Sequence, residues 1–501
     1  MDTSVLIVGA GPVGLTLAHK LATYGCPIRI IDKNQAPTDL SKALVVWQRT
    51  LEVLDSTVDI QQFLEHSDAS SVHGMIFQTP EETLGQVELD GSEGPLPTGV
   101  FIPQSATEHL LVEKLAQQGI HVERETELVS FTQDDHGVVS QIRGPQGDTT
   151  SVTSAWIVGA DGAHSKVRHG LDLPFDGDTI ERRWLLADIT VEKEQDPHFM
   201  HAYLGADAML GLFPVGAKRW RVILDGGPGA RRGDPTEQEI QDILDERTGK
   251  NWQITGSTWL SEFVINERLV PQYRVGRAFL AGDAAHVHSP AGGQGMNTGM
   301  QDAVNLAWKL ALAQGRDDCE QLLDSYHEER HVIGKKVVAE TSQMIHMAMV
   351  HNPLLLKLRA FAMRHATRSE WFKSIMRPKI SEIDLNYRGQ SLARTAHKTK
   401  GALQPGDRLP NMQEGDGFIY EKLRHNGATL LTLDVDPADL PQKLGSGVGA
   451  MPVHAVALNP DGALAQELGL PSGGAALVRP DSYIGAIRHN MPEMHSWLQS
   501  M

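Results

Sequence analysis

Three glycines near the amino terminus have the spacing of a dinucleotide-binding turn. Gly9, Gly11 and Gly14 follow the apolar run 5–8 and open an apolar helical pattern, and Asp32 comes 18 residues after Gly14. Glycines let the backbone approach a pyrophosphate, a helix end supplies N–H donors, and a carboxylate suits a ribose hydroxyl. Chance alone would supply roughly half a match to this spacing in such a chain, but the strand before it and the helix after it favour a dinucleotide over a ligand-free turn.

Two further blocks bring glycines together with acidic and imidazole side chains. Residues 158–165 read VGADGAHS after an apolar run, and residues 282–297 read GDAAHVHSPAGGQGMN. In the later block, glycines lead into a helix that begins near Thr298, so backbone N–H groups converge at a positive helix end. Such an end stabilises a bound negative charge by about 1 kcal/mol. The alternative is a glycine-rich loop that only caps the helix.

The same block contains the residue types of a two-histidine, one-carboxylate metal site, namely Asp283, His286 and His288. The glycine-rich context favours a cofactor loop, and the other histidines are scattered without ligand spacing. No metal is therefore expected.

The elements that must position these blocks follow from the apolar pattern. Residues 5–8 and 28–32 are predicted strands on either side of a helix over 15–24, a βαβ opening that implies a parallel sheet. Residues 175–270 alternate short β-rich pieces with turns rich in Gly and Pro, which is typical of an antiparallel sheet. Helical periodicity then dominates to about residue 379, and the last hundred residues read as a small α/β unit.

Composition limits the partners and the compartment. The chain has 501 residues and a net charge of −18, which argues against a nucleic-acid partner. No run approaches the roughly 20 apolar residues that cross a bilayer, and no secretory signal begins the chain. Only two cysteines occur, Cys26 and Cys319. We expect a cytoplasmic protein in a reducing environment, with no membrane partner.

The three blocks, in this order, resemble the FAD-dependent aromatic hydroxylases with the p-hydroxybenzoate hydroxylase fold, the class A flavoprotein monooxygenases. The branch with polyketide hydroxylases, pentachlorophenol monooxygenase and rifampicin monooxygenase is the most similar, and the resemblance covers most of residues 1–340. It implies an α/β fold: a Rossmann-like FAD-binding domain, an inserted, mainly antiparallel β-sheet substrate domain and a C-terminal thioredoxin-like α/β domain. That tail contains no cysteine, so thiol exchange there is excluded.

The resemblance also implies a division of the chain. The expected segments are an FAD-binding domain at 1–174 with part of the substrate region near 74–100, a substrate-binding sheet domain at 175–272, an FAD-binding completion and helical region at 273–395, and the thioredoxin-like domain at 396–501. Removal of residues from about 401 onward is expected to leave flavin binding intact.

Carried over by position, the resemblance implies a set of FAD contacts. For the ADP half these are Gly9, Gly11, Pro12, Val13, Gly14, Asp32 and Lys33; for the ribityl region Gln104, Gly282 and Asp283; for FAD and transient NAD(P)H Asp161 and Gly162; and along the flavin ring Pro290, Gly293, Gly295, Met296 and Asn297. Lys42 is a departure, because family members commonly have arginine there, and lysine keeps the charge but loses the bidentate phosphate contact. Arg49 also matches a family arginine and receives no role.

The implied reaction is hydroxylation of a phenolic or polycyclic aromatic substrate, with NADH or NADPH as transient reductant and O2, through a C4a-hydroperoxyflavin. No catalytic residue is assigned, although a phenol needs a group that accepts its proton. His201, Tyr203, Trp220 and Arg221 are candidates for that group. The candidate pocket residues are Tyr203, Met209, Leu212, Phe213, Trp220, Pro290, Ala291 and Gly292.

Several alternatives remain open at this point. The same fold performs Baeyer–Villiger insertion or inactivates aromatic antibiotics, and a flavin reductase or oxidase would produce peroxide. A non-catalytic flavoprotein that sequesters a ligand is a further possibility. The chain is expected to be a monomer or a homodimer.

Overall fold

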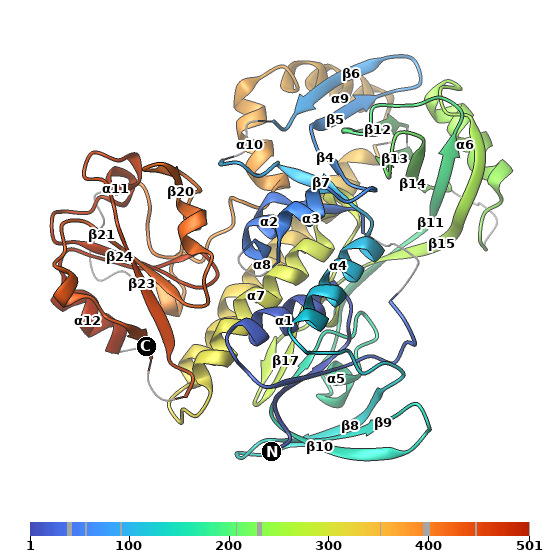
Figure 1. Ribbon diagram of the computed structural model, residues 1–501. Helices are drawn as coiled ribbons and strands as arrows, with labels where there is room; N and C mark the ends of the chain where they lie inside the picture. The colour runs from blue at the N-terminus through green and yellow to red at the C-terminus, as the bar shows by residue number, and fades with distance from the viewer. Residues whose placement is uncertain are drawn as a thin grey trace.

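A computed structural model shows two large β-sheets, joined by long helices, and a smaller C-terminal unit beside them (Figure 1). Lys42 lies outside the part of the chain that the structure describes. The described residues are 1–37, 43–55, 58–90, 93–206, 208–227, 233–350, 352–393, 401–445 and 448–499.

Four parallel strands from distant parts of the chain form the centre of a seven-stranded sheet, in the order β17-β10-β1-β2. Val8 of β1 pairs with Gly159 of β10, and Gly159 pairs with Leu280 of β17. The carboxyl ends of these strands therefore meet at one edge, where the three glycine-containing blocks follow them. The bounds are β1 Thr3–Val8, β2 Ile28–Ile31, β8 Glu127–Gln133, β9 Val138–Arg143, β10 Thr149–Gly159, β16 Arg274–Val275 and β17 Ala278–Leu280.

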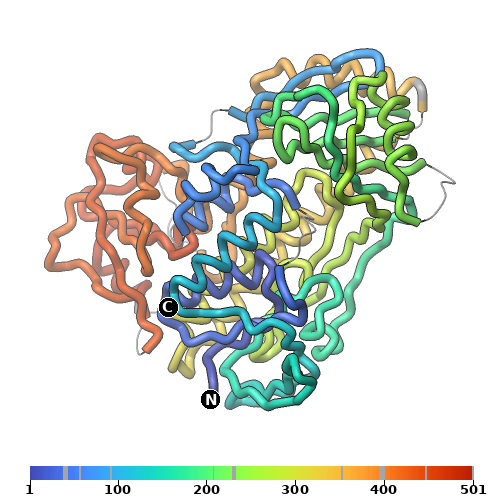
Figure 2. The backbone as a smooth tube through the Cα atoms, turned by 45° about the vertical axis from the view of Figure 1, so that its right-hand side comes forward, coloured from blue at the N-terminus to red at the C-terminus, as the bar shows by residue number. Residues whose placement is uncertain are grey.

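The helix α7 is the central element of this region. Every residue from Asn297 to Ala313 is buried, including the polar Asp302, Asn305 and Lys309, whose side chains pair with other buried groups. It packs against α1 and α8, and α1 also contacts α4; Figure 2 shows these segments side by side. The bounds are α1 Pro12–Thr23, α2 Gln48–Leu54, α3 Ile60–Leu64, α4 Gln104–Gln117, α5 Lys166–Gly170, α7 Gly295–Ala313 and α8 Glu320–Ala348.

The second sheet has eight strands in the order β18-β15-β11-β14-β13-β12-β5-β6. All neighbours are antiparallel except β12 and β5, as expected for an inserted, mainly antiparallel sheet. Because β18 contains His286, this sheet is bonded directly to the last glycine-containing block. The bounds are β5 Gly74–Gln78, β6 Thr83–Glu88, β11 Asp176–Val191, β12 Phe199–Gly205, β13 Ala208–Pro214, β14 Arg219–Asp225, α6 Glu237–Thr248, β15 Ile254–Leu269 and β18 His286–Val287.

Short strands and helices connect the two sheets. The strands β3, β7 and β4 form a small sheet beside the amino end of α7, and α9 and α10 lie across the β6 end of the second sheet. The bounds are β3 Val45–Trp47, β4 Ser70–Ser71, β7 Gly99–Phe101, α9 Pro353–Ala366 and α10 Glu370–Ile380.

The C-terminal unit is a five-stranded sheet with two helices, and it does not have a core entirely of its own. Leu430 and Met494 of this unit belong to the same buried cluster as Leu21 and Trp308 of the first region. The mixed α/β fold predicted from the sequence is confirmed. The bounds are β21 Ala428–Thr432, β22 Lys443–Leu444, β23 Met451–Ala457, α11 Ala463–Leu468, β24 Ala475–Val478, β25 Ile484–Arg488 and α12 Met491–Gln499.

Candidate active site

The glycine turn after β1 is tightly packed on one side and open on the other. A Cβ atom at Gly9 would lie 2.3 Å from the Ala160 carbonyl oxygen, and one at Gly14 would lie 2.0 Å from the Gly9 oxygen. A Cβ at Gly11 would have no atom of the described residues within 4 Å. Gly11 is also the cap of α1, without a side-chain cap, and no acidic residue stands in the first turn. The first N–H groups of α1, which begin at Val13 because Pro12 has none, therefore have neither a side-chain cap nor an intrahelical acceptor.

Asp32 lies beside this turn. Its Oδ2 accepts a 2.7 Å hydrogen bond from the Ala10 N–H, and its Oδ1 accepts one of 2.8 Å from the Asn34 N–H. Arg124 Nη1 is 3.8 Å from the same Oδ1, and Arg124 Nη2 is buried with no partner in the described part of the chain. Lys33 is exposed next to it. The carboxylate thus lies between the turn and an unsatisfied cation.

Asp161 occupies the corresponding place after β10. Its Oδ2 accepts a 2.6 Å hydrogen bond from the Lys166 N–H at the start of α5, while its Oδ1 is buried without a partner among the described residues. Burial raises the pKa of this carboxyl. Gly162 follows with a φ of 77°, which suits glycine.

The block after β17 is held by a buried ionic cluster. Asp302 Oδ2 accepts hydrogen bonds from the Gly282 N–H at 3.0 Å and pairs with His286 Nε2 at 2.8 Å, and Arg330 Nε lies 2.6 Å from Asp302 Oδ1. Burial opposes ionisation of Asp302, but Arg330 and His286 lower its pKa overall. Asp283, one residue after Gly282, is exposed. His286 is thus part of a structural ion cluster, and no metal-binding group of His, Cys, Asp or Glu occurs in the described residues.

His288 lies on the other side of His286, with the two rings stacked at 6.4 Å. Its Nδ1 is 2.8 Å from the Ser289 carbonyl oxygen, so the ring is an Nδ1–H tautomer and Nε2 is an acceptor. That Nε2 is buried with no partner in the described structure and lies against Gly295, the first residue of α7. Burial, with His286 nearby, lowers the pKa of His288 to about 4.

The loop from Pro290 to Gly295 is fixed by contacts that sequence reasoning missed. Trp47 Nε1 donates a 3.0 Å hydrogen bond to the Gly292 carbonyl, and the Trp47 N–H donates one of 2.8 Å to Asn297 Oδ1. Asn297 Nδ2 in turn donates to the Val45 and Gly293 carbonyls at 2.9 Å. Gly292 and Gly293 have φ values of 81° and 63°. The Asn297 side chain therefore ties the loop to β3, while the first N–H groups of α7, including that of Met296, have no intrahelical acceptor.

Gln104 begins α4 near the same strand. Its Oε1 accepts a 3.1 Å hydrogen bond from the Ala43 N–H, and its Nε2 donates to Glu108 Oε1 at 2.8 Å. The side chain is therefore held in place on the side of the loop that carries β3.

The predicted pocket residues divide between the two faces of the eight-stranded sheet. Met209 and Phe213 pack with Ala291 of the loop. Tyr203, Leu212 and Trp220 lie on the opposite face, in a core with α6. The structure thus brings two of these five sheet residues to the loop, together with a group that was not predicted: Ile180, Trp184, Ile223, Phe263, Ile265, Met344, Ile345 and Met349.

Polar groups on the loop-facing side are few. Trp184 is 1% exposed, and its Nε1 has no acceptor among the described residues. Arg221 forms a two-point ion pair with Asp188 at 2.7 and 2.6 Å, and its Nη1 is also unpartnered within the described chain. On the α6 face, burial lowers the pKa of His201 to about 4, and Trp252 Nε1 donates to the Tyr203 hydroxyl at 3.1 Å. His201 and Tyr203 are therefore not placed to exchange protons with a ligand at the loop.

Comparisons with known proteins agree with this geometry. A family described as an FAD binding domain matches residues 2–341. The chain is 33% identical to the 6-methylpretetramide 4-monooxygenase of Streptomyces rimosus over 96% of its own length and 90% of the relative's. It is 29% identical to the pentachlorophenol 4-monooxygenase of Sphingobium chlorophenolicum, over 97% and 94% of the two chains. The chain belongs to this FAD-binding family.

Solved structures give the same assignment. The OxyS anhydrotetracycline hydroxylase from Streptomyces rimosus has a TM-score of 0.76 and 30% identity, and the match covers 98% of this chain and 96% of that one. The flavin-dependent monooxygenase PieE, solved with FAD and substrate, has the same fold with a TM-score of 0.84 at 22% identity, over 100% and 98% of the chains. The resemblance seen in the sequence is confirmed: this flavoprotein is an FAD-dependent aromatic monooxygenase that uses NAD(P)H and O2.

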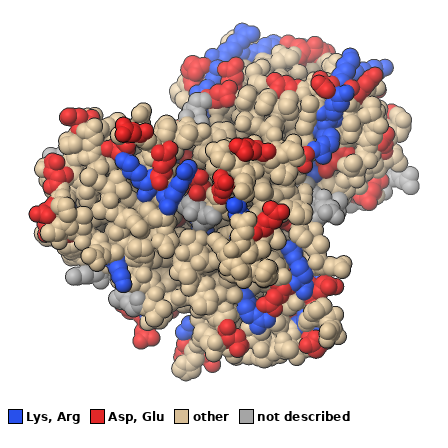
Figure 3. Space-filling view, in the orientation of Figure 1, with Lys and Arg blue, Asp and Glu red and all other residues tan. Residues whose placement is uncertain are grey.

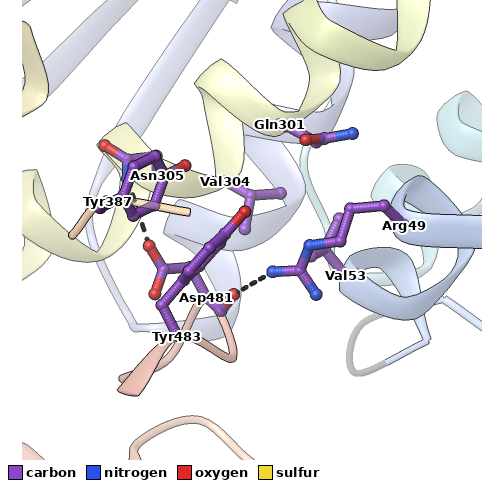
Figure 4. A pocket seen from close by; sticks show the side chains of 8 residues that line it. All are labelled: Arg49, Val53, Gln301, Val304, Asn305, Tyr387, Asp481 and Tyr483. Atoms are coloured by element: carbon purple, nitrogen blue, oxygen red, sulfur yellow. Dashed lines mark hydrogen bonds between the residues drawn. The ribbon is translucent and has the colours of Figure 1, made fainter. Parts of the chain in front are cut away.

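Arg49 of the flavoprotein, which received no role from the sequence, lies at the contact between α2 and the C-terminal unit. It lies in α2, beside a small cavity of about 10 Å³ between α7 and the C-terminal unit, and points toward Asp481 (Figure 4). Its Nη2 donates a 2.5 Å hydrogen bond to the Asp481 carbonyl, and its Nη1 pairs with Glu52 at 3.1 Å. Arg49 thus joins the FAD-binding fold to the C-terminal unit.

Proposed function

We propose that this monooxygenase hydroxylates a phenolic or polycyclic aromatic compound, with polyketides among the candidates, bound between the 290–293 loop and the Trp184 face of the second sheet. The observation that carries the proposal is the composition of that face. Aromatic and aliphatic side chains surround Ala291, and the indole N–H of Trp184 is an unpartnered donor among them in the described structure. A mostly apolar site with few polar groups suits a flat, oxygen-bearing ring system.

The residues at the carboxyl edge of the first sheet fit FAD. The open side of Gly11, the uncapped first turn of α1 and the unsatisfied Nη2 of Arg124 suit a pyrophosphate and ribose next to Asp32. Gln104, Asp161 and Asp283 would hold the central part of the cofactor. When bound, FAD supplies the hydride acceptance and oxygen activation that no side chain provides.

The chain itself would prepare the ring site in three ways. The first N–H groups of α7, at Gly295 to Asn297, would stabilise negative charge at the flavin edge by about 1 kcal/mol. The apolar face around Trp184 would exclude water. The Trp184 N–H would donate to a substrate oxygen and so orient the ring and stabilise its phenolate form.

Antibiotic inactivation is a second candidate, because the rifampicin monooxygenase of Streptomyces venezuelae is 32% identical over 83% of this chain and 87% of the relative. Oxygen insertion into a carbon–carbon bond next to a carbonyl would add the same mass as ring hydroxylation. Nuclear magnetic resonance spectra of the product separate the two reactions.

The cellular compartment and the oligomeric state are also part of the proposal. Cys26 and Cys319 are buried and unbridged, which suits a reducing cytoplasm. A monomer or a homodimer is proposed as the oligomeric state, and sedimentation velocity at two protein concentrations distinguishes them.

The test is NAD(P)H consumption by the FAD-loaded protein with a panel of phenols and polycyclic aromatics. We expect consumption to rise with a substrate, without free peroxide as assayed with catalase, and with a product that gains one oxygen atom. Consumption that only yields peroxide, whatever aromatic compound is present, would make the protein an oxidase. FAD binding without any reduction would favour a ligand-sequestering flavoprotein.

A further inference from the structure

Helices α9 and α10 leave an apolar face uncovered at the β6 end of the second sheet. Leu354, Leu358 and Phe361 of α9 are 74%, 59% and 57% exposed, and Trp371 of α10 is 72% exposed. The three α9 residues are four and three positions apart, so they share one face of the helix. Large apolar patches on a folded protein mark contact with a partner or a membrane.

Polar contacts help to hold α9 against the rest of the protein. Among its described side chains none is buried. Arg359 donates to the Ala348 carbonyl at 2.7 Å and to the Gly205 carbonyl at 3.0 Å, and Arg364 pairs with Glu82. On the opposite side of α9, Leu356, Ala360 and Met363 are half-buried, so the exposed apolar residues are additional to those that pack inward. The exposed apolar face of α9 is therefore suited to contact with another molecule.

The same two helices are basic in an acidic protein. Residues 352–380 contain seven lysines and arginines and one acidic residue, in a chain of net charge −18. Arg364, Lys373 and Lys379 have acidic partners, whereas Lys357 and Arg368 show no ion pair with any described residue. Figure 3 shows basic side chains gathered at the upper end of the molecule, beside acidic ones, where Figure 1 places α9 and α10.

We propose that α9 and α10 form a docking surface for an anionic lipid bilayer. The leucines and phenylalanine of the exposed α9 face, with the exposed tryptophan of α10, would enter the headgroup region, and the lysines and arginines of the two helices would meet lipid phosphates. A second copy of the chain fits less well, because pairing two identical faces would bring both basic sets together. None of the described helices has the length and apolarity to pass through a bilayer. The contact is peripheral and revises the sequence-based expectation of no membrane partner.

The surface adjoins the proposed substrate site but does not depend on it. Met344 and Met349, near the end of α8, pack with Trp184 and Ala291, and α9 begins four residues after Met349. Vesicle binding is measured without substrate or turnover, so its failure would leave the proposed hydroxylation untouched.

The experiment is vesicle flotation of the full-length, FAD-loaded protein. Vesicles contain phosphatidylcholine alone or phosphatidylcholine mixed with phosphatidylglycerol, at low and high salt. We expect binding to the mixed vesicles only, weaker at high salt. We also expect a blue shift of tryptophan fluorescence that Trp371→Phe reduces.

Two double variants separate charge from apolar contact. Lys357→Glu with Arg368→Glu, and separately Leu358→Ser with Phe361→Ser, should each weaken binding about tenfold or more. Lys443→Glu and Val448→Ser, exposed in the C-terminal unit, are matched controls that should bind like the unaltered protein. FAD content and thermal unfolding should be the same in all of these proteins.

Three results would overturn the proposal. They are the absence of binding to either vesicle, equal binding to both vesicles, and a dimer that Leu358→Ser with Phe361→Ser dissociates while the unaltered protein ignores vesicles. The last result would assign the surface to a second copy of the chain.

Discussion

Helix α7 passes two buried polar regions, and they differ in whether their groups have partners. Beside its middle, Lys309 Nζ lies 2.8 Å from Glu329, and Arg479 of the C-terminal unit binds Glu329 at 2.6 Å and Asp481 at 2.5 Å. At its amino end, His288 Nε2 is buried without a partner in the described structure, and so is Trp184 Nε1 on the facing sheet.

This difference distinguishes a region that stabilises the fold from a region that binds ligands. A buried polar group without a partner costs about 1–3 kcal/mol, so a protein retains such groups mainly where something else completes them. The ionic cluster is complete within the chain and holds the C-terminal unit against α7. The amino end of α7 is incomplete, which is what a cofactor and substrate site requires.

The largest expected effect is in the ionic cluster. Arg479→Ala leaves Asp481 buried without its cation and Glu329 with Lys309 alone, and should lower the free energy of unfolding by about 3–5 kcal/mol. Arg424→Ala is the control, because Arg424 also links the C-terminal unit to α2, through Asp55 at 2.8 Å, but is half exposed. It should cost under about 1 kcal/mol in urea unfolding. Equal costs would contradict the distinction.

The ionic cluster also changes what we expect when the C-terminal unit is removed. From sequence alone, removal of residues from about 401 onward is predicted to leave flavin binding intact. The shared core and the ion pairs of Arg479 lead us to expect that the truncated protein will lose stability and FAD together. A soluble truncated protein that keeps FAD would show that the cluster is dispensable.

A pair of glycine substitutions sharpens the other side of the contrast. Gly14→Ala forces a Cβ against the Gly9 carbonyl and should lower stability by about 1–3 kcal/mol. Gly11→Ala meets no described atom, so the protein should unfold as before while its affinity for FAD falls about tenfold. Thermal unfolding of the FAD-free proteins and fluorescence titration with FAD measure the two quantities. Unchanged FAD affinity in Gly11→Ala would mean that the open side is not where the phosphates bind.

The buried carboxyl of Glu382, near the amino end of α7, should make the stability of the protein depend on pH. It accepts hydrogen bonds from Thr298 Oγ1 at 2.9 Å and Gln301 Nε2 at 2.7 Å, and burial raises its pKa to about 8. The native protein then holds a proton that the unfolded chain releases above a pKa of 4.5, so its stability falls as pH rises from about 4.5 to 8. Glu382→Gln cannot ionise and should lack this loss, which amounts to at most about 1.4 kcal/mol per pH unit. Parallel urea-unfolding profiles of the two proteins over this range would refute the assignment.

The smallest expected effect concerns Trp184. Trp184→Phe keeps the ring but removes the N–H, and kcat/KM for an oxygen-bearing aromatic substrate should fall about tenfold, or about 1.4 kcal/mol, with FAD affinity unchanged. Trp220→Phe on the α6 face is the matched control, since Trp220 packs against His201 and Trp252 rather than toward the loop. If both variants lose the same activity, the indole N–H of Trp184 has no special role.

The parts of the site that sequence predicted are those with local causes. The turn at Gly9 to Gly14 and the loop before α7 are encoded by glycines next to a strand or a helix, and the structure places both at the same sheet edge. Backbone N–H groups at a helix end need no distant partner, so their presence follows from a short stretch of sequence.

The features of the site that could not be predicted from the sequence depend on packing between segments that are far apart in the chain. The alternation of Met209, Leu210 and Leu212 along β13 assigns residues to opposite faces of the strand, but only α6 decides which face is closed. Trp47 and Arg49 also appear ordinary in sequence, because their partners Asn297 and Asp481 lie hundreds of residues away. No sequence pattern distinguishes Trp184 from the other tryptophans among the nine in the chain.

The central claim is that three distant blocks of the chain bind one FAD whose ring faces the Trp184 side of the second sheet. The most direct measurement is a titration of the FAD-free protein with FAD, followed by the visible spectrum of the complex as an aromatic substrate is added. We predict one FAD bound per chain and a substrate-dependent change in the flavin spectrum that Trp184→Phe weakens. Failure to retain FAD, or a flavin spectrum that no aromatic compound perturbs, would contradict the claim.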